Sequence, residues 1–371
     1  MKVWILFSVG ILLALSQSAY SVDIHNTYKW NRKNVNKNNG KVDRDPWYEW
    51  WYYKVVDPKT SKSFFFVYGI VNPWDDAGTM KGTRSYVGMG DFKNKLNLEE
   101  HFPISNFSSS YDKTFVAIDS NMATDKKIYG SIIDKSGKIA KWDVDVTKKW
   151  SFNATGWATG KMITNIEWYP AQADALCNGT ITVGAEVTKL TDAPCYQDRN
   201  WGHSFPKWWT WIVSNHFEGH SETALAIGGG KPQFFGKVEP IEGVAIGLKH
   251  KGVEYHFRPN DLDLVRVNIK FGKWEVLGLN RKYKIEIVAS APKDQFMDLE
   301  FVTPEGKVFH DYETLTGEIK VKLYKRPRYL IGKWELIDTL TTKYGGIEYG
   351  SDKDYGLTSL LNENIELFSN F

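Results

Sequence analysis

Residues 196–211 read YQDRNWGHSFPKWWTW and gather polar, charged and aromatic side chains into sixteen positions. The stretch contains the acid Asp198, the imidazole of His203, the carboxamide of Asn200 and four of the sixteen tryptophans of the chain. This mixture is typical of a small-molecule pocket, which has an apolar wall and few polar groups. It is equally typical of an aromatic-rich strand and turn that pack a β-core. Both interpretations place the stretch at the centre of a β-fold.

The chain on either side of this stretch predicts strands rather than helices. Short apolar runs such as KWDVDV alternate with period two, and they are separated by Gly, Pro, Asn or Asp at spacings of about ten residues. Aromatic residues make up 15% of the 371 positions, and such side chains favour a pleated, half-buried surface. The length fits two domains. We therefore expect barrels or sandwiches. The aromatic block at 47–53 is echoed at 208–211, either by chance or because two similar β-units follow each other.

The first residues have the layout of a secretory signal. Lys2 precedes an apolar run from Val3 to Leu15, and small residues follow at Ala19 and Ser21. An uncleaved anchor is the alternative. No later segment is long and apolar enough to span a bilayer, so we expect a soluble mature protein, secreted or in the endomembrane lumen. The sequons at Asn106, Asn153 and Asn178 then predict glycosylation sites.

Cys177 and Cys195 are the two cysteines of the chain. In an oxidising lumen we expect them to form a disulfide, which would close a loop of about 18 residues. Two buried thiols are the alternative, because the sequence does not fix the distance between the Cα atoms. Two cysteines without a His pair at ligand spacing do not predict a zinc site, and we expect no metal.

Charge and motifs exclude several function classes. The net charge of +3 gives no electrostatic footprint for nucleic acid. Gly228–Gly230 are followed by Lys231 and Pro232 rather than by the Lys-Ser/Thr and helix of a phosphate-binding loop. No serine lies in a nucleophile elbow, and neither cysteine has papain-like surroundings. Nucleophilic hydrolysis is therefore not indicated.

Acid chemistry in an aromatic setting remains. On a strand the side chains of Tyr196 and Asp198 share a face, and a carboxyl group beside apolar rings tends to keep its proton. Such a group could protonate an alkene, and nearby tryptophans could stabilise the carbocation by cation–π attraction. The alternatives are an ion pair of Asp198 with Arg199 or a turn cap. A lone histidine such as His203 is either structural or catalytic. Glu49, inside the early aromatic run, is either solvated or buried against a partner.

Three segments together carry a family resemblance. They are WYEWWYYKVVDPKTSKSFFFVYGIVNP from Trp47, NIEWYPAQADALCNG from Asn165, and YQDRNWGHSFPKWWTWIVSNHFEG from Tyr196 with TALAIGGG after it. With GVEYHFRPND and KVKLYKR, they make the chain similar to the tocopherol cyclase family, whose wider relatives include carotenoid hydratases, AttH-like proteins and lipocalin-type Diels-Alderases. His203 departs from the small residue of the plant cyclases, and KYGGIEYG is shorter than their last glycine-rich run.

The resemblance implies an all-β fold with two tandem lipocalin-like β-barrel domains and a hydrophobic pocket. We expect a signal peptide at 1–21, a flexible lead-in at 22–46, β-domains at 47–195 and 196–349, and a tail at 350–371. The resemblance also implies catalytic roles for Asp198, Tyr196 and Asn200. We expect His203 to join them, because it follows Gly202 and lies near Asp198 in the sequence. The ligand-binding residues that it implies are Trp201, Trp209, Trp211, Phe205, Glu49 and Trp51.

Two functions follow as hypotheses. In the first, the protein is a cyclase of the isomerase class that needs no cofactor, and Asp198 protonates an isoprenoid, prenylquinol or terpenoid to start its cyclisation or hydration. In the second, the same pocket belongs to a secreted carrier of a hydrophobic ligand. Under both hypotheses the partner is a hydrophobic small molecule and not a nucleic acid.

Overall fold

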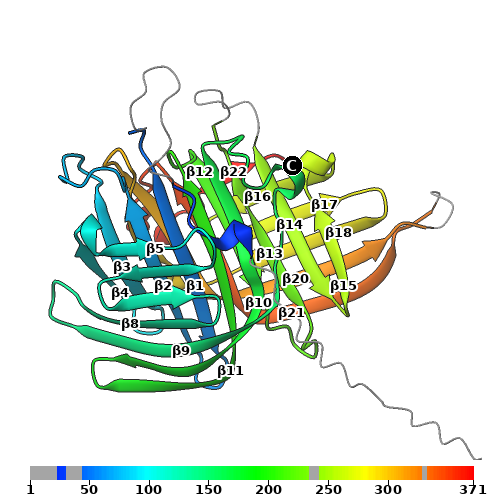
Figure 1. The fold of residues 1–371 in the computed structure, drawn as a ribbon. Helices are drawn as coiled ribbons and strands as arrows, with labels where there is room; N and C mark the ends of the chain where they lie inside the picture. Colours follow the sequence, from blue (N-terminus) through cyan, green and yellow to red (C-terminus); the bar gives the residue numbers. More distant parts are fainter. Residues whose placement is uncertain (1–22, 31–43, 234–241, 328–331) are drawn as a thin grey trace, which may run out of the picture.

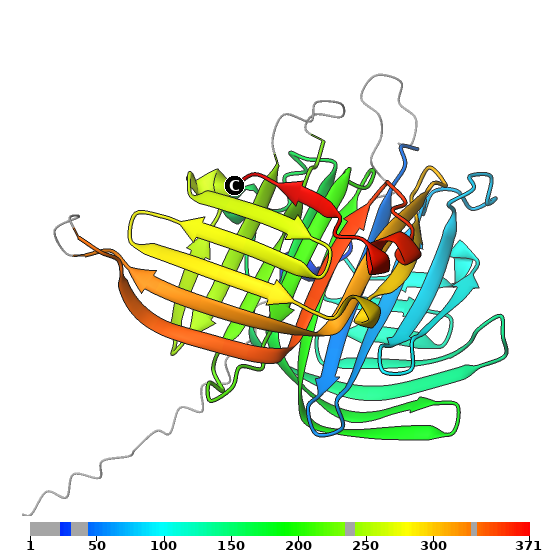
Figure 2. The same cartoon turned by 180° about the vertical axis from the view of Figure 1, so that it is seen from behind.

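The structure is a computed structural model, and it describes residues 23–30, 44–233, 242–327 and 332–371. The expected signal peptide lies outside these residues. In the described ranges the strands form two curled antiparallel sheets that lie side by side (Figures 1 and 2). The prediction of an all-β fold is confirmed, and the two curled sheets are consistent with two lipocalin-like barrel domains.

Sheet 1 is built from the first half of the chain. In order across the sheet its strands are β4 (Leu96–Phe102), β3 (Arg84–Asp91), β2 (Lys62–Val71), β1 (Tyr48–Asp57), β11 (Glu186–Gly202), β10 (Ile166–Val183), β9 (Ile139–Trp150), β8 (Lys127–Ile133), β7 (Asn121–Thr124), β6 (Phe115–Ile118) and β5 (Phe107–Ser109). Short 3-10 turns precede or interrupt the strands at η1 (Ile24–Asn26), η2 (Ile104–Asn106) and η3 (Gly156–Ala158).

Sheet 2 repeats this plan with the second half. Its strands are β15 (Val253–Phe257), β14 (Gly243–His250), β13 (Ala224–Gly230), β12 (Trp208–Ser214), β21 (Glu335–Ser351), β20 (Val308–Lys325), β18 (Tyr283–Ser290), β17 (Lys273–Leu279), β16 (Leu264–Lys270) and β22 (Glu366–Ser369), and β19 (Met297–Val302) pairs with β20. The connections hold η4 (Pro259–Asp261), η5 (Lys293–Gln295) and the helix α1 (Leu357–Asn362).

The two sheets share a topology. In each, the first strand of the unit pairs with the last long strand, so that β1 lies against β11 and β12 against β21. The aromatic blocks at 47–53 and 208–211 fall on these equivalent strands, β1 and β12. Their echo in the sequence therefore marks two similar β-units.

The boundary between the sheets differs from the one expected between residues 195 and 196. The strand β11 continues through this point to Gly202, because residues 195–202 pair along their length with β1. Sheet 2 begins at Trp208. The expected tail also contributes structure, since β22 pairs with β16 at the edge of sheet 2.

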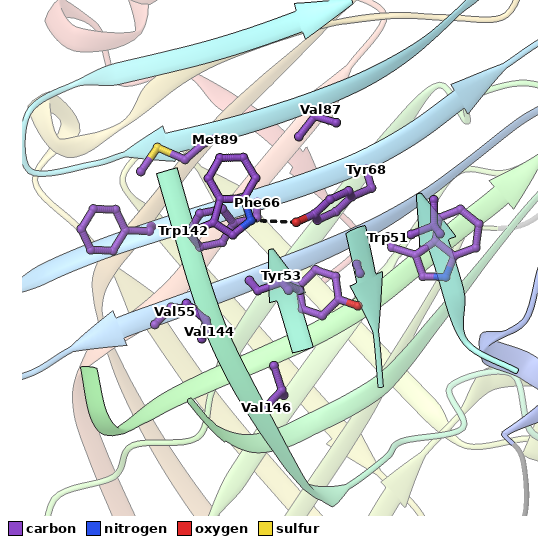
Figure 3. Close-up of a cluster of buried hydrophobic side chains, with 14 of the residues drawn as sticks. Trp51, Tyr53, Val55, Phe66, Tyr68, Val87, Met89, Trp142, Val144 and Val146 are labelled. Atoms are coloured by element: carbon purple, nitrogen blue, oxygen red, sulfur yellow. Dashed lines mark hydrogen bonds between the residues drawn. The ribbon is translucent and has the colours of Figure 1, made fainter. Parts of the chain in front are cut away.

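Large side chains fill the interior of each barrel. In sheet 1, Trp51, Trp142 and Trp201 are almost completely buried, and the indole of Trp142 donates a hydrogen bond of 2.7 Å to the hydroxyl of Tyr68 (Figure 3). In sheet 2, Trp274 is fully buried in an equivalent core. A third apolar cluster lies where the two sheets meet, and it includes Tyr48, Trp50 and Trp211.

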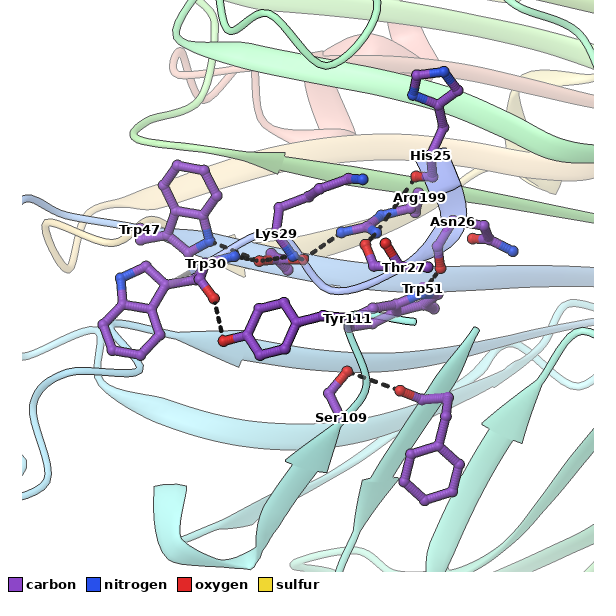
Figure 4. Close-up of polar contacts among 12 residues, drawn as sticks. His25, Asn26, Thr27, Lys29, Trp30, Trp47, Trp51, Ser109, Tyr111 and Arg199 are labelled. Atoms are coloured by element: carbon purple, nitrogen blue, oxygen red, sulfur yellow. Dashed lines mark hydrogen bonds and ion pairs between the residues drawn. The ribbon is translucent and has the colours of Figure 1, made fainter. Parts of the chain in front are cut away.

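A buried ion pair joins β1 to β11 inside the first barrel. The guanidinium of Arg199 contacts the carboxylate of Glu49, and both side chains have no exposed surface (Figure 4). The guanidinium lies between two indoles, 4.7 Å from the ring centroid of Trp51 and 4.6 Å from that of Trp201. Burial raises the pKa of Glu49, while Arg199 and the donors around it act in the opposite direction.

Residues 23–30 complete this ion pair and are not a loose lead-in. The backbone N–H groups of Lys29 and Trp30 donate to Glu49 at 3.0 and 2.6 Å, and Arg199 donates to the carbonyl of Thr27 (Figure 4). Asn26 is fully buried and donates a 2.9 Å hydrogen bond to Gln197. Buried charges require such partners, which explains why this polar segment packs against the barrel.

Cys177 on β10 and Cys195 on β11 form a disulfide, with their Cα atoms 5.8 Å apart. The predicted pairing is confirmed. The bridge links neighbouring strands close to the point where the register between β10 and β11 shifts.

We predict that Arg199→Met lowers the free energy of unfolding by about 3–5 kcal/mol, because it leaves the carboxylate of Glu49 buried without its cation. Urea denaturation measures this loss. The matched control is Lys273→Met, which removes the cation from an exposed pair 2.7 Å from Glu275 and should change stability by less than about 1 kcal/mol. Equal losses in the two variants would contradict the special role of Arg199.

The double variant Cys177→Ser/Cys195→Ser should lose on the order of 3 kcal/mol, the chain-entropy value for a closed loop of this size. Thermal unfolding with and without a reducing agent checks this expectation. Reduction should destabilise the unmodified protein to the level of the double variant and leave the variant unchanged. A reduction-insensitive melting temperature of the unmodified protein would be inconsistent with the bridge.

Candidate functional site

A cavity of about 470 Å³ lies between the two sheets. Its walls are mostly aromatic and small residues, and its polar lining includes seven side chains that bear a carboxyl group or a carboxamide. The aromatic side chains are Trp50, Tyr52, Trp157, Trp168, Trp209, Trp211 and Phe301. The polar side chains considered below are Asp198, Asn200, Asp311, Glu313 and Glu348.

Strand alternation explains which residues face the cavity. On β11, residues 196, 198 and 200 point toward sheet 2, and residues 197, 199 and 201 point into the first barrel. The strand β1 alternates in the same way, with Trp50 and Tyr52 on the cavity side. Both faces of these two strands are therefore buried.

Asp198 is 4% exposed and has two hydrogen-bond donors on one oxygen. The indole of Trp168 donates to Oδ2 at 2.7 Å and the hydroxyl of Tyr196 at 2.8 Å. The indole of Trp211 in turn donates to the Tyr196 hydroxyl at 3.1 Å. Burial raises the pKa of Asp198 to about 7, and these hydrogen bonds partly oppose the rise. At neutral pH this carboxyl group is poised to give or take a proton.

A run of three glycines shapes the same cavity. Gly228, Gly229 and Gly230 line it from β13. A Cβ on Gly228 would lie 2.6–2.9 Å from ring atoms of Trp168, so the indole of Trp168 requires a glycine at this position. Because β13 passes so close to this ring, it holds in place the indole that donates a hydrogen bond to Asp198.

Three more carboxyl groups line the wall formed by sheet 2. Asp311 and Glu313 lie on β20 and Glu348 on β21, and one ligand atom from each lies within 4.8 Å of the others. The hydroxyl of Tyr52 donates to Glu313 at 2.5 Å from the opposite sheet. Burial raises the pKa of all three acids well above the usual range, and repulsion among them adds to the rise. A cluster of three carboxyl groups like this can hold protons or ligate a cation.

The expected site residues divide between the cavity and other places. Asp198, Asn200, Trp209 and Trp211 line the cavity, and Tyr196 contacts Asp198 from behind the wall. Phe205 packs against this wall, with its ring centroid 5.5 Å from that of Trp209.

Four expected residues lie elsewhere. Glu49, Trp51 and Trp201 are on the barrel face of their strands, where they surround Arg199, and so they do not line the cavity. The solvated interpretation of Glu49 is wrong, because Glu49 is fully buried. His203 is exposed, accepts or donates a 3.1 Å hydrogen bond at Pro46, and packs edge-on against Trp47.

The three sequon asparagines are half-buried and hold local contacts. Asn106 donates to Asp119 at 3.3 Å, Asn153 donates to Gly156 at 3.2 Å, and Asn178 donates to Asp192 at 3.2 Å. Glycosylation at these positions stays a prediction.

Sequence reasoning missed Tyr52, Trp168 and the three acids on sheet 2. One signal was present in the run VFHDYETL, where Phe309, Asp311, Glu313 and Leu315 alternate with period two. When acids alternate in step with the apolar residues of a strand, they lie on its buried face, so this pattern indicates buried carboxyl groups. Their proximity to Glu348 and to Asp198 depends on long-range pairing that the sequence does not display.

The fold and the site define a class: a two-unit β-protein with an aromatic, acid-bearing cavity between its sheets. The chain belongs to the tocopherol cyclase-like family, whose profile matches residues 119–351. It is 25% identical over 362 residues to a probable chloroplastic tocopherol cyclase of Oryza sativa subsp. japonica, and 23% identical over 360 residues to the chloroplastic tocopherol cyclase of Zea mays. Each match covers 82% of this chain and 75% of the relative. These similarities support a cyclase-type role.

A solved structure shares the fold. The crystal structure of CghA has a TM-score of 0.51 and 10% identity, with coverage of 89% of this chain and 95% of that one. Kievitone hydratase from Nectria haematococca has a TM-score of 0.49 and 11% identity, with coverage of 82% and 88%. Among the described residues, no helix has the length and apolar character that would let it cross a membrane.

We predict that Gly228→Ala displaces the indole of Trp168 and removes its hydrogen bond to Asp198. The pKa of Asp198 should then rise from about 7 to about 8, since a hydrogen bond to the charged form is worth about 1.4 kcal/mol. Infrared titration of the protonated carboxyl band measures the change, with Asp198→Asn as the spectral reference.

The matched control for this test is Gly243→Ala. Gly243 also lines the cavity, but the atom nearest to its Cβ position is Cγ of Pro259 at 4.0 Å. The control should leave the titration unchanged. If the unmodified protein, Gly228→Ala and Gly243→Ala gave the same titration curve, the contact at Gly228 would not set the pKa of Asp198.

Proposed function

We propose that the protein is an enzyme that cyclises or hydrates a prenylated or terpenoid substrate without a cofactor, with Asp198 as the proton donor. The observation that carries the proposal is a buried carboxyl group with a pKa of about 7 in an aromatic cavity. Family membership supports a cyclase-type reaction. A hydrophobic prenyl substrate is consistent with the apolar walls.

The chemistry begins at the alkene of the substrate. The protonated carboxyl of Asp198 gives its proton to one alkene carbon, and the other carbon becomes cationic. Trp50, Trp209 and Trp211 line the space where this charge develops. Cation–π attraction is worth about 2 kcal/mol or more at a desolvated site, which favours the cation over the neutral alkene. A hydroxyl of the substrate or a water molecule then adds to the cation through its oxygen, and this oxygen releases its proton.

Two neighbouring residues support this role of Asp198. Tyr196 acts as a positioning residue, because its hydroxyl contacts Oδ2 of Asp198 and is itself held by Trp211. Asn200 lies two residues after Asp198 on the same face of β11 and lines the cavity. It offers its carboxamide to a polar group of the substrate. His203 is exposed outside the cavity, and we assign it no catalytic role.

We also propose that the protein works in an oxidising compartment, secreted or within the endomembrane lumen. The disulfide between Cys177 and Cys195 supports this location, because such bonds persist where thiols are not kept reduced.

The test uses a prenylated hydroquinone as the probe and follows its mass and retention by chromatography. We predict that Asp198→Asn lowers turnover on the order of 10²–10⁴-fold. The matched control is Asp174→Asn, which changes an equally buried acid that accepts from Asn215 outside the cavity, and it should retain turnover. Unchanged turnover in Asp198→Asn would refute the assignment. Probe that is bound but unaltered by the unmodified protein would instead support a carrier.

The same variant separates lost chemistry from lost structure. The pKa of Asp198 is raised in the folded state, so the unfolded state releases this proton first as the pH rises above about 4, and the stability of the unmodified protein falls toward pH 7. Asp198→Asn removes this penalty. Its free energy of unfolding should exceed that of the unmodified protein by as much as about 4 kcal/mol at pH 7, with little difference below pH 4.

A further inference from the structure

The acids of sheet 2 face Asp198 across one cavity. Glu313 and Glu348 are direct partners in the register between β20 and β21, and Asp311 lies on the same face of β20. Asp311 and Glu313 are 2% and 1% exposed. In the described part of the chain, Oδ1 of Asp311 is buried without a hydrogen-bond partner. This oxygen is a second indication that the wall is built to meet a polar group.

The internal repeat relates the two sets of acids. Tyr52 on β1 pairs with Asp198 on β11, and Trp211 on β12 pairs with Glu348 on β21. The rings of Tyr52 and Trp211 meet edge to face, 5.8 Å apart, so these two pairs lie opposite each other. Each sheet therefore presents an acid to the cavity from an equivalent strand.

The negative charge of the sheet 2 acids is expected on Glu313. Three carboxyl groups so close together, two of them buried and that of Glu348 half-buried, cannot all ionise, so some of them keep their protons at neutral pH. Glu313 receives the hydrogen bond of Tyr52, and the buried amine of Lys54, whose pKa burial lowers to about 7, acts on it electrostatically. Glu348 and Asp311 interact with each other, with further acids and with the indole of Trp209, and neither of them has a cation among these partners. Glu313 is thus the best placed of the three to be ionised and to accept a proton.

We infer that Glu313 is a second catalytic residue that takes the proton from the attacking hydroxyl, while Asp198 supplies the proton to the alkene. The inference rests on the proposed function and applies to cyclisation and hydration alike. A C–H bond forms with the proton of Asp198, a C–O bond forms between the hydroxyl oxygen and the cation, and the O–H bond breaks as its proton passes to Glu313. Nothing is oxidised or reduced. The proton on Glu313 leaves to solvent, and Asp198 regains one when the product departs.

Two probes separate the two roles. The first is the prenylated hydroquinone, which can close its ring. The second is its O-methyl ether, which has no proton to lose from the attacking oxygen but can still exchange deuterium into its alkene in D₂O, because Asp198 can give a proton and take one back. Ring closure and exchange are measured by chromatography and mass spectrometry.

We predict that Glu313→Gln lowers ring closure on the order of 10²–10⁴-fold and leaves deuterium exchange into the ether within about 2-fold. Asp198→Asn should lose both reactions, and Asp174→Asn should retain both. A Glu313→Gln variant that still closes the ring, or that loses exchange to the same degree as ring closure, would overturn the inference. If the unmodified protein performs neither reaction, the proposed function itself fails.

Infrared spectroscopy of the resting protein tests the charge assignment without turnover. At pH 7, Glu313→Gln should remove a carboxylate band, whereas Asp311→Asn or Glu348→Gln should each remove a protonated carboxyl band. A merely structural role of Glu313 would not produce this difference. Loss of ring closure on dialysis against a chelator, with recovery on addition of Mg²⁺, would overturn the inference in favour of a cation held by the three acids.

Discussion

The buried pair of Arg199 and Glu49 fixes the register between β1 and β11, and the candidate site depends on this register. A slip of one residue would turn every side chain of β11 to the opposite face. Arg199 would then enter the aromatic cavity and Asp198 would enter the barrel, where Glu49 already places a negative charge. Each of these two placements would bury an unpaired charge, at a cost of several kcal/mol. The ion pair therefore acts as a register lock for the carboxyl group on the other face of the strand.

The two faces of these strands use buried polar groups in opposite ways. Glu49 accepts hydrogen bonds from Lys29, Trp30 and Trp47 and contacts a cation, so nearly all its capacity is satisfied. The acids on the cavity side have fewer donors, and burial raises the pKa of each. Such groups lower stability at neutral pH. Apolar residues could fill this wall without that cost. The presence of acids there is explained if they transfer protons during the reaction.

The sequence predicted the β-class and the two units, and it identified several residues that line the cavity, but not the boundary between the units. The same-face rule placed Tyr196 and Asp198 together correctly. Applied further, the rule would have put Trp201 on the other face, and density of aromatic residues alone misplaced Trp201 and Trp51. The segment at 23–30 looked polar enough to be loose, because its partners, Glu49 and Arg199, are distant in the sequence. The acids of sheet 2 were missed for the same reason, since only the pairing of β20 with β21 brings them together.

Packing also explains why the cavity lies between the sheets rather than inside either barrel. In a lipocalin-like barrel the interior can hold a ligand, provided that side chains do not fill it. Here Trp51, Trp142 and Trp201 fill the interior of the first barrel, and Trp274 fills that of the second. Where the sheets meet, by contrast, several positions are glycines, which have no side chain to fill the space. A site in this position has one wall from each unit. Duplication of the unit therefore provides two sets of acids for one cavity, and in the proposed mechanism one wall would deliver a proton while the other removes one.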